Sequence, residues 1–216
     1  MKPSEIVGKG TLNPVYLTQD DPDYPSKIQQ YLGSHTPKVI SALGNLDILQ
    51  HMLLGIFCSV KCPGNLIIRT YDLSQNLKEK GIAVIGGFHS PIEQECLRIL
   101  LRGTQPIIIC PARSINGMRI KAEYKKSLAE GRLLFLSPFT EKQRRISADT
   151  ALLRNYFVAA LADSTFVAYA APHSKTERFC QEIVTWGKSL YAFTNECNAN
   201  LIKLGAQSIK KYDGCA

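Results

Sequence analysis

Residues 82–93 combine three features that together suit the binding of an anion. Apolar residues are followed by Gly86–Gly87, and glycine allows a sharp turn and the close approach of a ligand to the backbone. Ser90, Pro91 and Glu93 then have the types and spacing of an N-cap, a first helical residue and the reciprocal arm of a capping box. Because free N–H groups and the positive end of the helix dipole gather at a helix N-terminus, we predict a phosphate-binding loop here. A well-capped strand–helix connection with no ligand is the alternative.

Most of the positive charge of the chain lies in one segment. The formal net charge is +8, and residues 111–155 contain ten Lys or Arg against four Asp or Glu, a local excess of +6. This excess suits a polyanion, although a solubilising surface has the same composition. The candidate phosphate ligands in the segment are Arg113, Arg144, Arg145, Arg154 and Asn155. For Arg154 the alternative is a bond to a core carboxylate or carbonyl, and we interpret Arg119 and Lys121 as charges at the rim.

The residues that could perform catalysis or hold a metal do not form a recognisable set. His89 and His173 lie in expected loops, while Asp149 and Asp163 fall on a different helix or at its end, so no Ser-His-Asp arrangement is legible. The seven cysteines include no CxxC pair and no second pair at zinc-ligand spacing. We therefore expect no catalytic residue, metal or cofactor, and a binding protein rather than an enzyme.

The apolar runs and the N-terminus bear on the cellular compartment. The apolar runs are too short to span a membrane, and the first ten residues lack the apolar core of a signal peptide. Cysteines in apolar runs, such as Cys58, Cys96 and Cys110, indicate a reducing environment. We expect a cytoplasmic protein without a membrane partner.

The elements that must position these residues alternate between strand and helix. Buried strands are expected at 53–59, 82–86, 106–110, 132–136, 165–170 and 189–193. Helices are expected at 66–80, 91–102, 120–130, 148–162 and 175–186. This alternation predicts an α/β, Rossmann-like fold, in which a doubly wound and mostly parallel sheet carries helices on both faces. Residues 1–45 are more polar and form a lead-in lobe, and residues 46–216 form the Rossmann-like domain.

Ligands of such sheets bind at the carboxyl ends of the strands. The loops expected there contribute the candidate ligands Ser59, Lys61, Gly86, Gly87, His89, Ser90, Arg113, Ser174 and Lys175. Ser174 and Glu177 have the spacing of a second capping box. Phe88 and Phe139 are candidates for stacking on a base, with a lid over the core as their alternative role.

The order of several motifs resembles the DNA-processing protein A (DprA/Smf) family. The segments that carry the resemblance are Tyr24-Pro25, Pro37 and Gly44, residues 86–90, residues 153–161 and residues 200–206. Residues 153–161 resemble the arginine–asparagine helix of the family, and Asn200-Leu201-Ile202-Lys203-Leu204-Gly205-Ala206 resembles its terminal signature. The family has a Gly-Ser-Arg turn after its first strand, whereas this chain has Cys58-Ser59-Val60-Lys61, so Lys61 would supply the charge.

The resemblance implies a function as well as a fold. It implies an extended Rossmann fold that binds single-stranded DNA in a basic pocket, forms a homodimer and helps to load a RecA-type recombinase. These roles belong to DNA uptake in natural transformation and to recombination. We expect this chain to lack the winged-helix tail of some members.

A nucleotide-binding enzyme or sensor is the alternative function. The chain is also similar to the lysine-decarboxylase-like (LOG) phosphoribohydrolases, which use a Pro-Gly-Gly-x-Gly-Thr-x-Glu loop. Residues 172–177 keep a Pro, a Thr and a Glu of that loop but not its glycines.

Overall fold

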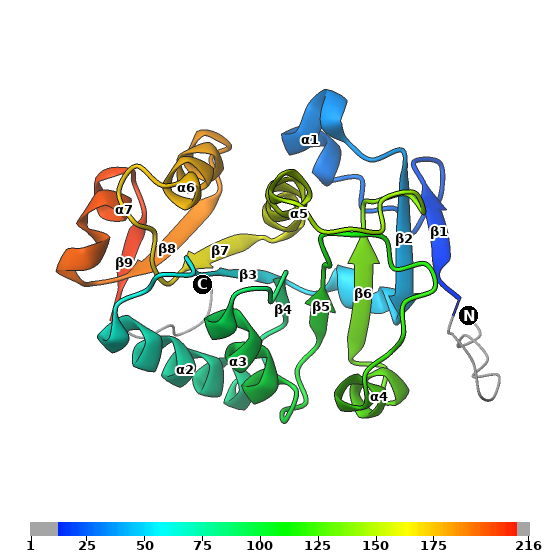
Figure 1. Cartoon of the computed structure of the whole chain (residues 1–216), viewed down its shortest axis with the longest axis horizontal. Helices are drawn as coiled ribbons and strands as arrows, with labels where there is room; N and C mark the ends of the chain where they lie inside the picture. The colour runs from blue at the N-terminus through cyan, green and yellow to red at the C-terminus, as the bar shows by residue number, and fades with distance from the viewer. Residues whose placement is uncertain (1–12, 211–216) are drawn as a thin grey trace.

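A computed structural model describes residues 13–210 as a single nine-stranded sheet with helices on both faces (Figure 1). The strand order is β1-β2-β6-β5-β4-β3-β7-β8-β9. The strands are β1 (Val15–Thr18), β2 (Val39–Gly44), β3 (Leu54–Phe57), β4 (Val84–Gly86), β5 (Ile107–Ile109), β6 (Leu133–Ser137), β7 (Ser164–Val167), β8 (Ser189–Phe193) and β9 (Gln207–Ile209). Residues 1–12 of the predicted lead-in lobe lie outside the described range.

The strands from β6 to β9 in this order are all parallel, and β2 joins β6 in the antiparallel direction. The chain builds outward from β3 through β4 and β5 to β6, and then returns to the other side of β3 to form β7. The strand order therefore reverses between β3 and β7, which is the position where doubly wound sheets bind ligands. The predicted mostly parallel, doubly wound fold is confirmed.

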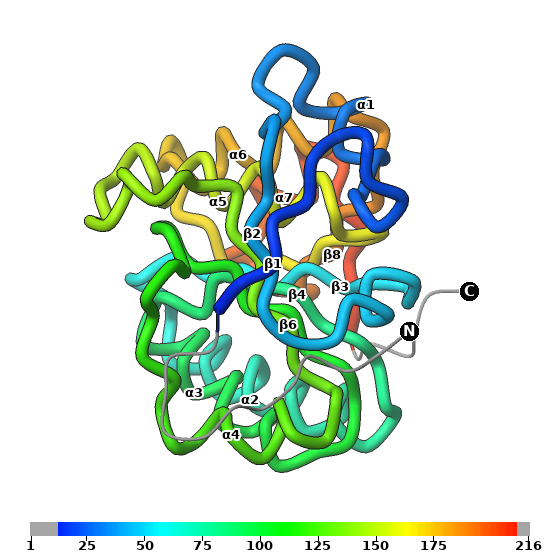
Figure 2. Tube along the Cα trace, turned by 90° about the vertical axis from the view of Figure 1, so that its right-hand side faces the viewer, coloured from blue at the N-terminus to red at the C-terminus, as the bar shows by residue number. Residues whose placement is uncertain are grey.

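Two layers of helices cover the sheet. The α-helices are α1 (Ile28–Leu32), α2 (Gly64–Glu79), α3 (Pro91–Leu100), α4 (Ala122–Ala129), α5 (Ala148–Leu161), α6 (Lys175–Thr185) and α7 (Ala199–Lys203). The 3₁₀ helices are η1 (Gly33–His35), η2 (Leu46–Gln50) and η3 (Glu196–Asn198). Figure 2 shows α2, α3 and α4 on one side of the sheet, and α1, α5 and α6 on the other.

The core is divided by the sheet into two apolar clusters. Successive side chains of a strand point to opposite faces, so Val84 packs in the cluster with Leu66 and Cys96, whereas Ile85 packs in the cluster with Phe157. Both β4 residues are fully buried. Strands that are buried on both faces explain why the predicted strands are continuous apolar runs rather than alternating ones.

The six predicted strands correspond to β3–β8, while β1, β2 and β9 were missed. The two N-terminal strands come from the predicted lead-in lobe and extend the main sheet at its β6 edge. Gly44 ends β2 with φ of 124°, and a Cβ there would lie 2.2 Å from the carbonyl oxygen of Leu133. Only glycine therefore allows β2 to approach β6 this closely at that point.

In the part of the chain that the structure describes, each helix is too short or too polar to cross a membrane.

Candidate functional site

Two N–H groups of the loop between β4 and α3 are bonded to a carboxylate of the protein itself. Glu93 Oε1 accepts the N–H of Cys58 at 2.9 Å, and Glu93 Oε2 accepts the N–H groups of His89 at 2.9 Å and Ser90 at 3.3 Å. The predicted capping box of Ser90 and Glu93 is present, and the Glu93 side chain is buried. These N–H groups thus already have an anionic partner, and Glu93 ties the end of β3 to the start of α3.

The side chain of Arg154, on α5, is buried against the loop between β4 and α3. Only 4% of the residue is exposed, and its Nη1 donates to the carbonyl oxygen of Cys110 at 3.1 Å while its Nε donates to Asn155 Oδ1 at 2.8 Å. A bond to a carbonyl is one of the two roles that the sequence predicts for Arg154, and the structure shows that bond. Burial lowers the pKa of Arg154, and the nearby charge of Glu93 opposes this shift.

Side chains packed against Gly86 and Gly87 leave little room for a larger residue at either position. A Cβ at Gly87 would lie 1.6 Å from Nη1 of Arg154, so the guanidinium occupies the space next to this residue. A Cβ at Gly86 would lie 3.0 Å from the Phe88 ring. Phe88 has φ of 46° and is buried, so its ring acts as a lid over the core and is not available to stack on a base.

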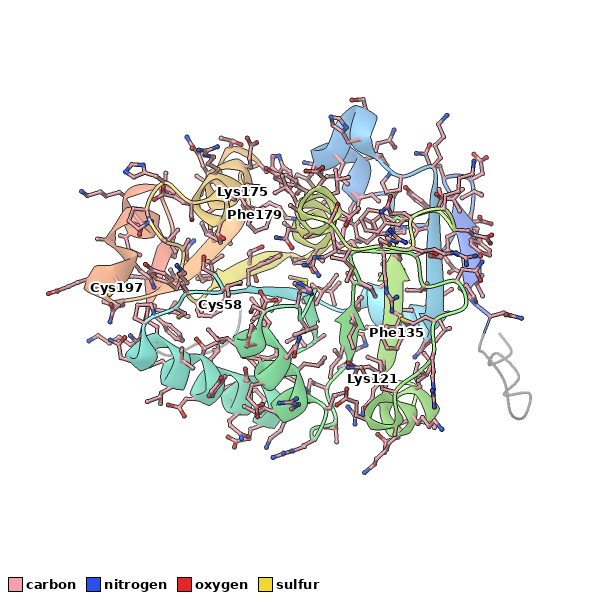
Figure 3. All side chains as sticks on the ribbon, viewed as in Figure 1. Cys58, Lys121, Phe135, Lys175, Phe179 and Cys197 are labelled. Carbon is pink, nitrogen blue, oxygen red and sulfur yellow. The ribbon has the colours of Figure 1, made fainter. Side chains whose placement is uncertain are left out.

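The loops after β3 and β7 hold the remaining predicted ligands. The N–H of Ser59 donates to the carbonyl oxygen of Tyr169 at 3.0 Å, which joins the two loops across the switch point. Lys61 and Lys175 are exposed, and His89 is exposed on the neighbouring loop after β4. Figure 3 shows Lys175 on the α6 side of the sheet and Lys121 on the α4 side. These two lysines therefore lie on opposite faces of the sheet.

The second predicted capping box is only half formed. Ser174 accepts the N–H of Glu177 at 3.1 Å, but Glu177 Oε2 accepts the N–H of His173 at 2.6 Å instead of that of Ser174. Glu177 Oε1 accepts from Asn200 Nδ2, which also donates to the carbonyl oxygen of Ala170 at 3.0 Å. Glu177 thus fastens the C-terminal segment to the loop after β7. Its engaged oxygens give no support to a phosphoribohydrolase role for this carboxylate.

A group of arginines, which we call the arginine rim, lies on the loops after β5 and β6. It consists of Arg113, Arg119, Arg144 and Arg145, and all four residues are exposed. Within residues 13–210 none of the four forms an ion pair, whereas five other basic residues do. The paired residues are Lys27, Arg98, Lys121, Lys126 and Arg132. The rim therefore carries positive charge without a local carboxylate partner.

Arg119 is not among the phosphate ligands that the sequence predicts. The structure places it in the lining of the same cavity as Arg113 and Arg144. Gly117 is the feature of the sequence that could have indicated a turn that brings Arg119 back to this cavity. Among the described residues, groups of three His, Cys, Asp or Glu side chains that could hold a metal are absent.

The chain is similar to proteins of DNA processing and recombination. The model of a family described as DNA recombination-mediator protein A matches residues 15–215. Protein Smf of Synechocystis sp. is 27% identical over 218 residues, which cover 94% of this chain and 49% of that protein. The chain thus spans about half the length of this curated relative.

Two solved structures have the same fold. DNA processing protein A (DprA) from Streptococcus pneumoniae gives a TM-score of 0.76 at 17% identity, covering 93% of this chain and 72% of that one. DNA processing protein A from Helicobacter pylori, whose single-stranded DNA binding mode was the subject of its structure, gives 0.71 at 18% identity, covering 91% of both chains. The fold, the motif order and the family match agree, and this chain belongs to the DNA recombination-mediator protein A family.

Proposed function

We propose that this protein binds single-stranded DNA without catalysing a reaction on it, as part of DNA processing and recombination. Family membership supports this role, as does the single-stranded DNA binding of the Helicobacter pylori relative. The observation that carries the proposal is the arginine rim, because unpaired guanidinium groups bind phosphates with bidentate geometry. It lies at the carboxyl edge of β5 and β6, the side of the sheet where this class of fold takes its ligands.

An aromatic side chain next to the rim is suited to contact the bases. Ser137 Oγ donates to the carbonyl oxygen of Arg113 at 2.9 Å and accepts the N–H of Phe139 at 3.2 Å, so these two residues are held on one side chain. Phe139 is half-buried. Base–aromatic stacking contributes about 1–3 kcal/mol per base in single-strand binders. We assign the phosphates to the rim and one base to Phe139.

The other predicted ligands fall into two groups under this proposal. Ser90, Arg154 and Asn155 form bonds within the protein, and Gly86 and Gly87 leave the space that the Phe88 ring and the Arg154 guanidinium occupy. Exposed or half-buried residues of neighbouring strand ends extend the DNA path, namely Ser59, Lys61, His89, Ser174 and Lys175.

Binding of a fluorescent oligothymidylate, followed by anisotropy, tests the proposal. The Arg144→Gln/Arg145→Gln double variant is expected to bind at least about tenfold more weakly, the scale of lost charge-assisted contacts. Arg102→Gln is the matched control, because Arg102 is an exposed arginine that follows α3 at the opposite edge of the sheet. Failure of the unmodified protein to bind, or equal losses in both variants, would contradict the proposal.

We further propose that the protein acts in the cytoplasm as a homodimer that hands DNA to a RecA-type recombinase. These roles follow from the family resemblance. Light scattering coupled to size-exclusion chromatography measures the oligomeric state, and the rate at which a RecA-type protein assembles filaments on single-stranded DNA measures the hand-over. A monomer at all concentrations would contradict the first, and an unchanged rate of filament assembly would contradict the second.

A further inference from the structure

Three of the rim arginines surround one cavity. Its volume is about 400 Å³, and Arg113, Arg119 and Arg144 line it together with Ser114 and Asn116. The cavity opens between the loop after β5 and the loop after β6. A concave site that presents several guanidinium groups differs from a flat basic surface, because it can enclose one small anionic group.

Hydrogen bonds between the two loops fix the positions of two of these arginines. The N–H of Ser114 donates to the carbonyl oxygen of Gln143 at 2.8 Å, and Ser137 Oγ donates to the carbonyl oxygen of Arg113 at 2.9 Å. Arg113 precedes Ser114 and Arg144 follows Gln143, so these bonds hold the two arginines beside each other. These contacts fix the backbone from which the two side chains extend.

A tight turn brings the third arginine back to the same cavity. The N–H of Asn116 donates to Ser114 Oγ at 3.1 Å, and the N–H of Met118 donates to the carbonyl oxygen of Ile115 at 3.0 Å. Gly117 has φ of 66°, a conformation that favours glycine in such a turn. Ile115 is fully buried and anchors the turn, so Arg119 returns to the cavity.

Within residues 13–210, none of the three arginines that line this cavity forms an ion pair. Glu141, the acid on the same loop as Arg144, accepts a hydrogen bond from the Tyr16 hydroxyl at 2.8 Å. Arg144 Nε donates only to the backbone carbonyl of Glu141, at 3.4 Å. Three like charges held around one cavity repel each other, and an anion placed between them relieves this repulsion.

We propose that this cavity binds a phosphate monoester, the chemical group found at the 5′ end of a DNA strand and in a nucleoside monophosphate. A monoester carries close to two negative charges and three terminal oxygens, whereas an internal diester of DNA carries one charge and two free oxygens. Three guanidinium groups can donate to three terminal oxygens, and they attract a group with close to two negative charges more strongly than a diester with one. If the monoester is the 5′ end of a DNA strand, this inference rests on the proposed binding of single-stranded DNA. If it is a nucleoside monophosphate, the inference is independent of that function.

The test compares ligands that differ only in the phosphate. In one arm, a 3′-labelled oligothymidylate is measured with a 5′-phosphate and with a 5′-hydroxyl, and in the other, AMP is compared with adenosine by calorimetry. The phosphorylated ligand is expected to bind at least about tenfold more tightly, as charge-assisted hydrogen bonds imply. Arg119→Gln is expected to abolish this preference, while Arg102→Gln at the opposite edge retains it.

The two arms distinguish a DNA end from a nucleoside monophosphate as the source of the phosphate. They also distinguish failure of the monoester site from failure of single-stranded DNA binding. Preference in the oligonucleotide arm assigns the cavity to DNA ends, and preference in the AMP arm alone assigns it to a nucleotide. If phosphorylated and unphosphorylated ligands bind equally in both arms, or if Arg119→Gln keeps the preference, the inference is overturned. In that case tight binding of the 5′-hydroxyl strand would still support the proposed function, so the two failures are distinguishable.

Discussion

The guanidinium of Arg154 occupies the space that a side chain at Gly87 would need. Its Nη1 lies 1.6 Å from the position of a Cβ at Gly87, and the same atom donates to the carbonyl oxygen of Cys110. This contact links α5 to the ends of β4 and β5, so the arginine–asparagine helix is locked onto the glycine loop.

Gly87→Ala tests this contact. The added methyl group would displace a buried guanidinium, so we expect the free energy of unfolding to fall by about 1–3 kcal/mol, as in other overpacked cores. Urea denaturation measures the change. Gly64→Ala is the control, because a Cβ at Gly64 meets no atom within 4 Å. Equal stability of the two variants would show that Arg154 does not hold this position in solution.

Glu93→Gln tests the carboxylate that binds three N–H groups. The amide has one acceptor oxygen, and its NH₂ group would face an N–H donor, so we expect a loss of about 1–3 kcal/mol in the free energy of unfolding. Glu95→Gln on the same helix is the control, because Glu95 forms an exposed ion pair with Arg98 that contributes little. A Glu93→Gln protein as stable as Glu95→Gln would contradict the assigned bonds.

Asn200 provides a prediction about pH. Its hydrogen bond to Glu177 is the main reason why the pKa of that carboxyl lies below 4.5 in the folded protein. A lowered folded pKa adds stability that is present above the unfolded pKa and is lost as the pH falls through the folded value. Asn200→Ala should therefore weaken the loss of stability on acidification, measured by urea unfolding at neutral pH and below pH 4.5. A pH dependence as steep as that of the unmodified protein would disprove the coupling.

The thiols should differ in reactivity in the folded protein. Burial raises the pKa of Cys96, Cys110 and Cys180 to about 12, so these residues should resist iodoacetamide. A hydrogen bond from Cys58 lowers the pKa of Cys62, and Cys197 is exposed. Among the six cysteines of residues 13–210, mass spectrometry after brief alkylation is expected to find label on Cys62 and Cys197 first. Early labelling of the three buried thiols would contradict the packing of the core.

The elements with strong local signals were predictable from the sequence. Strands β3–β8 are apolar runs bounded by glycine or by helix caps, and the Ser90–Glu93 cap is a local pattern. Strand β2 was missed because its apolar run, Val39–Gly44, follows a more polar, proline-containing segment that reads as a lead-in lobe. Strand β9 has only three residues, and so it carries little periodic signal.

The site was less predictable because its key contacts are long-range. Nothing close to Arg154 in the sequence indicates that its guanidinium packs on Gly87 and bonds to Cys110. Arg119 reaches the cavity only because the turn at Gly117 reverses the chain. Positive charge was correctly read as concentrated in residues 111–155, but the fold divides it between a buried arginine, paired surface residues and the arginine rim.

The salt dependence of DNA binding tests the central claim most directly. For single strands, the logarithm of affinity falls with the logarithm of salt concentration with a slope of about −0.7 per neutralised phosphate. Replacing Arg113, Arg144 and Arg145 by glutamine should make this slope less steep by about 2, since three such contacts are lost. The same slope in the triple variant and in the unmodified protein would show that the arginine rim does not hold the DNA backbone.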